Sequence, residues 1–319
     1  MKRSTLWLIT AAVLILLGAM IFGGVMTVLS WDFSKLSTAQ YETNRHEIGE
    51  KFSNISVETD TTDLTFALSE DGICRVECYE ESKGKHTVAV QDDTLTIKLV
   101  NEKAWYDYIG IHFAAPKIKV YLPEKEYASL CVRNSTGKVE MGEAFKFENV
   151  DISLTTGGVD FHSSVSETLK IGTSTGAIFV SDISAGAVDL SASTGEIAIS
   201  SVTCHGDTNI ALSTGKTRLK DVTCKNLSSK ANTGDVTMEN VVVTEKLYLE
   251  RSTGDVKFNG CDAAEIFIKT DTGDVNGTLL SDKIFVAQTD TGRVNVPRTV
   301  TGGRCEISTD TGDIQITVQ

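Results

Sequence analysis

The chain has 319 residues, of which 41% are hydrophobic and only 3 are proline, so it can bury a substantial core. Its 30 basic against 43 acidic residues give a net charge of −13, which leaves no basic surface to neutralise phosphates and argues against nucleic acid as a partner. Its 7 cysteines include no C-x-x-C pair and no Cys/His cluster at zinc-ligand spacing, so we interpret most of them as small core residues.

The first predicted element is a transmembrane helix over residues 6–30. This segment carries no charge, and at about 1.5 Å of rise per residue it exceeds the roughly 30 Å hydrocarbon core of a bilayer. A cleaved signal peptide is the alternative, but its apolar region is typically about 7 to 15 residues long, and no Ala-x-Ala site follows here. Because Lys2 and Arg3 precede the span and Asp32 follows it, the positive-inside rule predicts a cytoplasmic stub of residues 1–5 and an extracytoplasmic body.

Two irregular segments follow the span. Residues 31–50 are polar and unpatterned, which predicts a short stalk. Residues 51–133 contain short alternations of apolar and polar residues, which we interpret as two modified rungs that cap the open edge of a repeat. The first rung has Thr62 and the second Asp93 at the corner, and the apolar residues are Ile55, Val57, Leu64 and Phe66 in the first and Val88, Leu95 and Ile97 in the second.

From residue 134 to the end, the dipeptide Thr-Gly recurs every 19 or 20 residues. Positions two and four after each glycine, and seven and five before it, are mostly Val, Ile, Leu, Met or Phe, with Thr217 the exception at plus two. Such a fixed short period is typical of a solenoid. The corner glycines are Gly137, Gly157, Gly176, Gly195, Gly215, Gly234, Gly254, Gly273, Gly292 and Gly312.

The repeat predicts an all-β fold. Equivalent residues of successive rungs would pair in parallel about 4.8 Å apart and stack into apolar ladders, and glycine suits a corner because it can adopt positive φ. We therefore expect a single parallel β-solenoid of about 12 rungs over residues 51–319, with the regular repeat over 134–319 in the same domain as the cap. The crossover preference of parallel strands favours a right-handed coil.

Particular motifs connect the sequence to a known family. With its recurring Ser-Thr-Gly and Asp-Thr-Gly corners, its Trp105-Tyr106-Asp107 run and its segment from Lys119 to Pro123, the chain resembles the bacterial "putative adhesin" family of membrane-anchored β-strand-repeat domains of unknown function. The resemblance covers nearly the whole chain. It implies a solenoid behind a single membrane span and a role at the cell envelope, which in some relatives is associated with stress responses. It brings no catalytic residues with it.

The sequence offers little support for an active site. The five histidines fall on different rungs or outside the regular repeat. Cys204 and His205 are adjacent, but neighbouring strand residues point to opposite faces and cannot form a nucleophile and base pair. Cys204 and Cys224 each lie nine residues after a corner glycine, so they could stack as packed thiols or as a disulfide between rungs. We predict no catalytic residue, no organic cofactor and no enzymatic activity.

Three aspartates suggest one metal site. Asp271, Asp290 and Asp310 each open a corner, and if their rungs follow one another the carboxylates would stack about 4.8 Å apart. Such a stack is explained either by solvated side chains that cap turns, helped by Arg293, or by a bound Ca²⁺ ion with oxygen ligands. Both interpretations remain open at this point.

Three functions are compatible with these features. The first is a membrane-anchored, non-enzymatic binding, adhesin-like or scaffold module that contacts proteins or cell-wall components through flat polar faces. The second is an accessory or sensor protein of a cell-envelope stress response, and the third is a glycan-active β-helix enzyme. Composition alone does not name a ligand, because solenoid faces bind through local surface chemistry.

Overall fold

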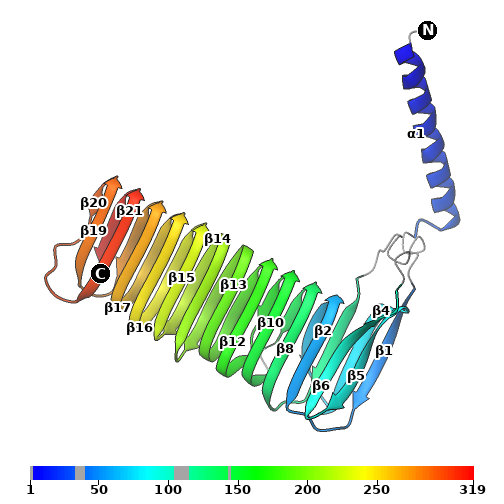
Figure 1. The fold of residues 1–319 in the computed structure, drawn as a ribbon, viewed down its shortest axis with the longest axis horizontal. Coiled ribbons are helices and arrows are strands. Elements are labelled where there is room, and N and C mark those ends of the chain that lie inside the picture. Colours follow the sequence, from blue (N-terminus) through cyan, green and yellow to red (C-terminus); the bar gives the residue numbers. More distant parts are fainter. Residues whose placement is uncertain (1–2, 33–39, 104–114, 143–144) are drawn as a thin grey trace.

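The computed structural model describes residues 3–32, 40–103, 115–142 and 145–319. It consists of one helix followed by a single long sheet that coils into a parallel β-solenoid (Figure 1). The predicted fold class is therefore confirmed. The run Trp105-Tyr106-Asp107 and His112 lie outside the described residues.

The helix is α1 (Arg3–Val28). The amino-terminal strands are β1 (Tyr41–Ile48), β2 (Asn54–Thr61), β3 (Asp63–Leu68), β4 (Cys74–Glu81), β5 (Gly84–Gln91), β6 (Thr94–Asn101) and β7 (Lys117–Leu122). The body contains β8 (Glu126–Thr136), β9 (Val139–Met141), β10 (Lys146–Thr156), β11 (Val159–Phe161), β12 (Ser164–Thr175), β13 (Ile178–Cys204), β14 (Asp207–Cys224), β15 (Asn226–Thr233) and β16 (Val236–Thr253). The carboxy-terminal strands are β17 (Val256–Thr272), β18 (Val275–Leu279), β19 (Lys283–Thr291), β20 (Val294–Asn295), β21 (Gly303–Thr311) and β22 (Ile314–Val318).

Helix α1 is apolar on all sides, and most of its side chains are exposed. The stretch Thr5–Val28 is long and apolar enough to cross a bilayer, a criterion that an amino-terminal signal sequence also meets.

The five rungs with corner glycines from Gly176 to Gly254 have two tight corners each. In the rung around Gly195, the chain turns first at this glycine, with φ at +151°, and again at Ser201, with φ at +53°. The sequence analysis did not predict the second corner. Its residue types nevertheless indicate it, because Asp, Asn and Gly tolerate the left-handed conformation best. The equivalent positions, six residues after the corner glycine, are Asp182, Asp221, Asn240 and Gly260, all with positive φ.

Stacking makes the corner glycines necessary for a second reason. Gly234 has φ at +128°, and a Cβ atom there would lie 1.7 Å from the carbonyl oxygen of Gly215 in the preceding rung. No side chain fits between two corners at that distance. In several rungs the residue three positions before the corner glycine donates a hydrogen bond to the carbonyl of the corner glycine in the adjacent rung. Thr270 Oγ1, for example, donates to the Gly254 carbonyl at 3.2 Å.

The apolar ladders form the core as predicted. Val236 pairs in register with Val256, and both are fully buried, as are most residues at the equivalent positions. Seven residues after the corner glycine a further apolar position is buried at Val222 and Val241, but Leu280 at the equivalent position is 46% exposed.

A polar cluster explains why Thr217 interrupts the ladder at plus two. Arg251 points into the solenoid, where its guanidinium donates to the Ser229 carbonyl at 2.8 Å, to Ser229 Oγ at 2.7 Å and to Thr217 Oγ1 at 3.4 Å. Only 1% of Arg251 is exposed, and its Nε has no hydrogen-bond partner. Burial lowers the pKa of Arg251 to about 10. A threonine at position 217 is therefore needed as an acceptor, not as an apolar ladder residue.

The amino-terminal rungs are not stacked in chain order. Strands β2 and β3 lie between β8 and β9 on one side and β6 and β7 on the other. The interpretation of Asp93 as a rung corner is wrong: it lies in the tight turn of the antiparallel hairpin β5–β6, where Asp92 and Asp93 both have positive φ. Leu95 and Ile97 instead pair with Ile55 and Val57 on the strand before the corner.

The predicted polar stalk is also shorter than expected. Residues 41–48 form β1, which pairs antiparallel with β4, and β4 in turn pairs antiparallel with β7. Strands β1, β4 and β5 thus make an antiparallel cap on the amino-terminal end of the coil (Figure 1). An exposed cap strand has too few apolar residues to show a pattern, so the sequence of this segment predicts a stalk instead.

At the carboxy-terminal end, too, the strands are not stacked in chain order. The last strands of the chain, β21 and β22, insert between β17 and β18 on one side and β19 and β20 on the other. The coil completes about nine turns, fewer than the predicted twelve rungs. At both ends the chain leaves the path of the coil and inserts its strands out of order.

Candidate binding groove

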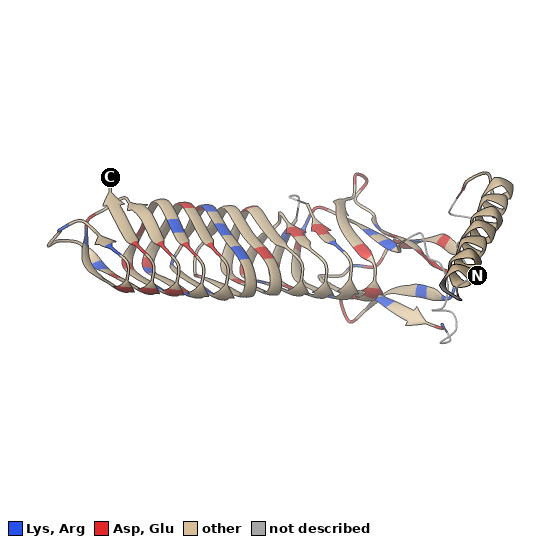
Figure 2. Ribbon diagram, turned by 90° about the horizontal axis from the view of Figure 1, so that it is seen from above, with Lys and Arg blue, Asp and Glu red and all other residues tan. Residues whose placement is uncertain are grey.

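Two outward faces of the solenoid carry the polar side chains. The post-corner face is formed by residues three and five positions after each corner glycine, and the pre-corner face by residues four, six and eight positions before it. In the view of Figure 2, acidic and basic residues are spread along the length of the body and are not gathered into one basic patch.

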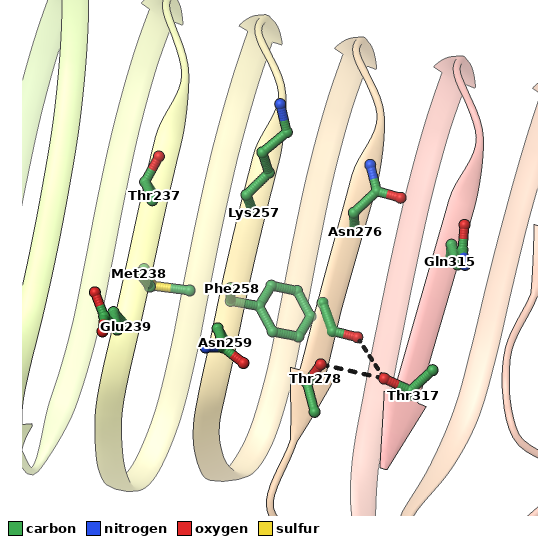
Figure 3. A pocket seen from close by; sticks show the side chains of 11 residues that line it. Thr237, Met238, Glu239, Lys257, Phe258, Asn259, Asn276, Thr278, Gln315 and Thr317 are labelled. Atoms are coloured by element: carbon green, nitrogen blue, oxygen red, sulfur yellow. Dashed lines mark hydrogen bonds between the residues drawn. The ribbon is translucent and has the colours of Figure 1, made fainter. Parts of the chain in front are cut away.

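A groove of about 450 Å³ crosses the post-corner face over β16, β17, β18 and β22 (Figure 3). Its side chains form two rows, each running from rung to rung at the inter-strand spacing of about 4.8 Å. The first row is Thr237, Lys257, Asn276 and Gln315, and the second is Glu239, Asn259, Thr278 and Thr317.

The floor of the groove depends on Gly277. Other rungs carry an apolar side chain at this position, four residues after the corner glycine, but Gly277 has none. The Phe258 ring occupies the vacant space, since a Cβ atom on Gly277 would lie 2.1 Å from Phe258 Cε2. The interruption of the plus-four ladder at Gly277 was visible in the sequence and is the signal that could have located the groove.

The groove offers hydrogen-bonding groups more than charges. Hydroxyl and amide groups supply both donors and acceptors. Thr317 Oγ1 lies 3.2 Å from Thr278 Oγ1 and donates to the Gly277 carbonyl at 3.4 Å. Of the two charged lining residues, Lys257 Nζ is paired with Asp255 at 3.2 Å and Glu239 lies 3.8 Å from Lys220 Nζ. Such a surface can hold an extended polar chain, and its lining includes no histidine or cysteine.

A second groove, of about 490 Å³, lies on the pre-corner face over β12 to β16. It is lined mainly by small side chains, with Lys230 and Glu250 as the charged residues, and these two form an ion pair at 3.1 Å. The remaining lining residues are Thr173, Ser191, Ala192, Ser193, Ala211, Leu212, Ser213, Ala231, Asn232 and Ser252.

The structure changes the order of the three predicted calcium ligands. Because β21 lies between β17 and β19, Asp310 stands between Asp271 and Asp290, so the order 271, 290, 310 expected from the sequence is wrong. Lys269 Nζ lies 3.9 Å from Asp271, whereas Arg293 contacts Asp313 at 2.8 Å and none of the three. The two interpretations, solvated aspartates that cap turns and a bound calcium ion, both remain open, and in the second Asp310 would be the shared ligand.

A different aspartate ladder stabilises the corners. The residue after the corner glycine is aspartate in four of the last five rungs, and its carboxylate accepts the backbone N–H of the equivalent residue in the next rung. Asp255 donates to Asp235 at 3.1 Å, Asp274 to Asp255 at 3.1 Å and Asp313 to Asp274 at 2.8 Å. The side-chain hydrogen bond from Arg293 lowers the pKa of Asp313.

The amino-terminal cap contains a buried polar network that sequence reasoning missed. His86 Nδ1 lies 2.6 Å from Glu80 Oε2, and His86 Nε2 lies 2.8 Å from Thr59 Oγ1. Burial alone would raise the pKa of Glu80, but hydrogen bonds from His86 and Asn44 together hold it below its ordinary value. The partners come from β1, β2, β4 and β5, so no local motif marked them.

This network also contains a cluster of residues that could hold a metal ion. Ligand atoms of Cys78, Glu80 and His86 lie within 4.8 Å of one another, all buried. Burial raises the pKa of the Cys78 thiol to about 12, and both ring nitrogens of His86 are already engaged. The arrangement therefore acts as a satisfied hydrogen-bond network that packs the cap against the first rungs. Cys204 and Cys224 are likewise buried free thiols.

Comparison with known proteins adds a family and a set of similar folds. The model of a family described as Toastrack DUF4097 matches residues 52–211 and again residues 205–319. No curated protein matches the chain.

Several solved structures are similar at low identity. A putative lipid binding protein from Parabacteroides distasonis ATCC 8503 is 17% identical, with a TM-score of 0.48, and the match covers 88% of this chain and 98% of the other. A putative adhesin from Bacteroides fragilis NCTC 9343 is 13% identical, with a TM-score of 0.41 and coverage of 87% and 97%. A putative adhesin from Parabacteroides merdae ATCC 43184 is 12% identical, with a TM-score of 0.38 and coverage of 88% and 97%.

Proposed function

Since the chain belongs to the Toastrack DUF4097 family, we propose that its body is a non-enzymatic binding module of the cell envelope, of the adhesin or scaffold kind. The observation that supports this function most directly is the groove on the post-corner face. It presents two parallel rows of mainly hydroxyl and amide groups on a rigid sheet, and a rigid backbone lowers the ordering cost of binding.

The groove chemistry favours an uncharged polar chain as the ligand. Asn259, Asn276 and Gln315 supply amide groups, and Thr278 and Thr317 supply hydroxyls, all without a formal charge. Hydroxyl-rich polymers such as envelope glycans match this pattern, because each sugar offers several donors and acceptors. A strongly anionic polymer fits less well, since the chain carries a net charge of −13.

We further propose that α1 anchors the body to the membrane. Its apolar stretch has the length of a membrane span, and the charges of Lys2 and Arg3 precede it, which supports a cytoplasmic amino terminus and an extracytoplasmic body. An anchored solenoid would hold its groove outside the membrane, where wall polymers are accessible.

Capture of the full-length chain on purified cell-wall fragments tests the groove. We expect the double variant Asn259→Ala, Asn276→Ala to lose most of the retention, because both rows then lack a central hydrogen-bonding group. The matched control is Asn209→Ala, an exposed asparagine on the pre-corner face of β14. Failure of the unaltered protein to bind, or equal binding by the double variant and the control, would overturn the proposal.

A further inference from the structure

A cation in the core of the solenoid has only neutral partners within the described part of the chain. Arg251 is 1% exposed, and its guanidinium donates to oxygen atoms that carry no charge. Nη1 donates to the backbone carbonyls of Ser229 at 2.8 Å and Glu250 at 2.7 Å, and Nη2 donates to Ser229 Oγ at 2.7 Å and to Thr217 Oγ1 at 3.4 Å. Burial lowers the pKa of Arg251, and no neighbouring charge in the described residues contributes to that shift.

The buried charge of Arg251 is not removed by deprotonation. A guanidinium keeps its proton at neutral pH even when it is buried, unlike a lysine or histidine side chain. Transfer of an ion into apolar surroundings is costly, so fully buried arginines are normally matched by an anion. Hydrogen bonds to neutral oxygens orient the guanidinium but leave its positive charge without compensation.

The surroundings of Arg251 also contain donors that are not used. A guanidinium has five N–H groups, and the Nε–H of Arg251 is buried without a hydrogen-bond partner. Ser229 and Thr217 are buried too, and in the described structure their hydroxyls only accept, which leaves both O–H groups able to donate. One N–H and two O–H donors therefore lie around a single positive charge, which is a donor set that suits a small anion.

The sequence departs from the apolar ladders next to this arginine. Thr217 is the exception two positions after a corner glycine, and Ser229 is the exception five positions before one, where the other regular rungs have Val, Ile, Leu or Ala. In the two adjacent rungs, the residues in register with Arg251 are Ala231 and Thr270, both small. Small neighbours favour a monatomic ion over a larger oxyanion, and one positive charge matches a monovalent ion.

We propose that Arg251, Ser229 and Thr217 form an internal binding site for a monovalent halide ion of the size of chloride or bromide. The anion accepts from Arg251 Nε–H and from the two hydroxyls, and it neutralises the buried guanidinium. Fluoride fits less well, because a strongly hydrated ion costs more to transfer into the core. This site goes beyond the proposed function and does not depend on the groove.

Urea unfolding of the full-length chain in detergent tests the site, with chloride replacing gluconate at a constant ionic strength of about 0.15 M. An equilibrium titration is suitable because a buried site exchanges its ion when the rungs open. We expect the urea midpoint to rise by roughly 0.5 M once free chloride exceeds its dissociation constant about tenfold, since the anion binds the folded state alone. Fluoride should raise the midpoint less.

The double variant Arg251→Met, Thr217→Val should lose the rise caused by chloride. In gluconate it should be at least as stable as the unaltered chain, so that loss of the chloride effect does not reflect a failure to fold. The matched control is Arg293→Met, which removes an arginine whose side chain is 88% exposed and should leave the chloride effect intact. No rise in the unaltered chain, or an equal rise in the double variant and the control, would overturn the proposal.

Crystals of the full-length chain grown in bromide give a second, independent measurement. We expect an anomalous scattering peak in hydrogen-bond contact with Arg251 Nε. Bromide peaks confined to the surface would overturn the proposal. A water molecule beside Nε in both bromide and gluconate would also overturn it, because a neutral molecule would then complete the hydrogen bonds.

Discussion

Replacement of Gly234 by valine should destabilise the body by about 2 to 6 kcal/mol. The backbone at this corner has φ at +128°, where a β-branched residue is strained by about 1 to 3 kcal/mol. A Cβ atom would also lie 1.7 Å from the Gly215 carbonyl oxygen, and overpacking against a fixed neighbour adds about 1 to 3 kcal/mol. The new Cβ clashes with a backbone carbonyl that itself takes part in the stack of corners, so neither rung can relax alone.

Two comparison variants separate these causes from loss of a contact. Asp235→Ala removes the acceptor for the Asp255 N–H at 3.1 Å, which should cost only about 0.5 to 1.5 kcal/mol. Gly49→Val adds the same side chain at a glycine with no atom within 4 Å of the new Cβ and no positive φ, and should cost within about 0.5 kcal/mol.

The urea midpoint of the full-length chain in detergent, followed by far-UV circular dichroism, decides the order of the three variants. Midpoints are preferable to extrapolated free energies because long repeat arrays can unfold in more than one step. We expect the midpoint to fall most for Gly234→Val. Equal shifts for Gly234→Val and Asp235→Ala would refute the argument that the corner requires glycine.

Four further experiments address other parts of the molecule. Replacing Arg251 by methionine together with Thr217→Val should leave the urea midpoint unchanged or raise it, because a buried cation without a carboxylate is exchanged for apolar packing; a large fall would mean that the cluster stabilises the core. The pKa of Glu80 is lowered in the folded state, so ionised Glu80 stabilises the fold fully above the ordinary carboxyl pKa of about 4.3, and this stabilisation is lost as the pH falls below that value. Glu80→Gln should therefore make the urea midpoint depend less on pH on the acid side. An unchanged pH dependence would contradict this. Millimolar calcium should raise the melting temperature of the full-length chain and do so no longer after Asp290→Asn with Asp310→Asn, and no shift in the unaltered protein would end the calcium prediction. Protease added to wall-stripped cells should digest the body while a cytosolic control survives; survival of both would mean that the body is not outside.

Part of the candidate site could be anticipated and part could not. The post-corner face follows from the alternation of side chains along a strand, so the outward position of Lys257 and Asn276 was implied by the buried Val256 and Val275. The groove itself depends on the single residue Gly277 and on the ring of Phe258 in the rung beside it, which is a contact between rungs. The network around Glu80 and His86 was not anticipated, because its partners come from four strands that only the folded cap brings together.

What the sequence alone determined is the local geometry of the repeat. A corner glycine every 19 or 20 residues, with apolar residues at constant offsets, specifies where the chain turns and which face of each strand is buried, because φ preferences and side-chain alternation act within one rung. Stacking in parallel then follows, since no rung can bury its apolar face alone.

Only the tertiary structure decided the order of the rungs at the two ends. Equivalent residues have the same offsets from the corner glycine in every rung. Ile266 and Ile268 of β17 therefore match the apolar positions of β21 as well as those of β19, and the repeat period does not show which of these strands pairs with β17. The choice depends on contacts between segments distant in the chain: Asp262, for example, pairs with the buried Lys283 at 2.6 Å and ties β17 to the terminal strand across the inserted β21. The same long-range contacts place Asp310 between Asp271 and Asp290 and put β19, not the last strand of the chain, at the end of the molecule.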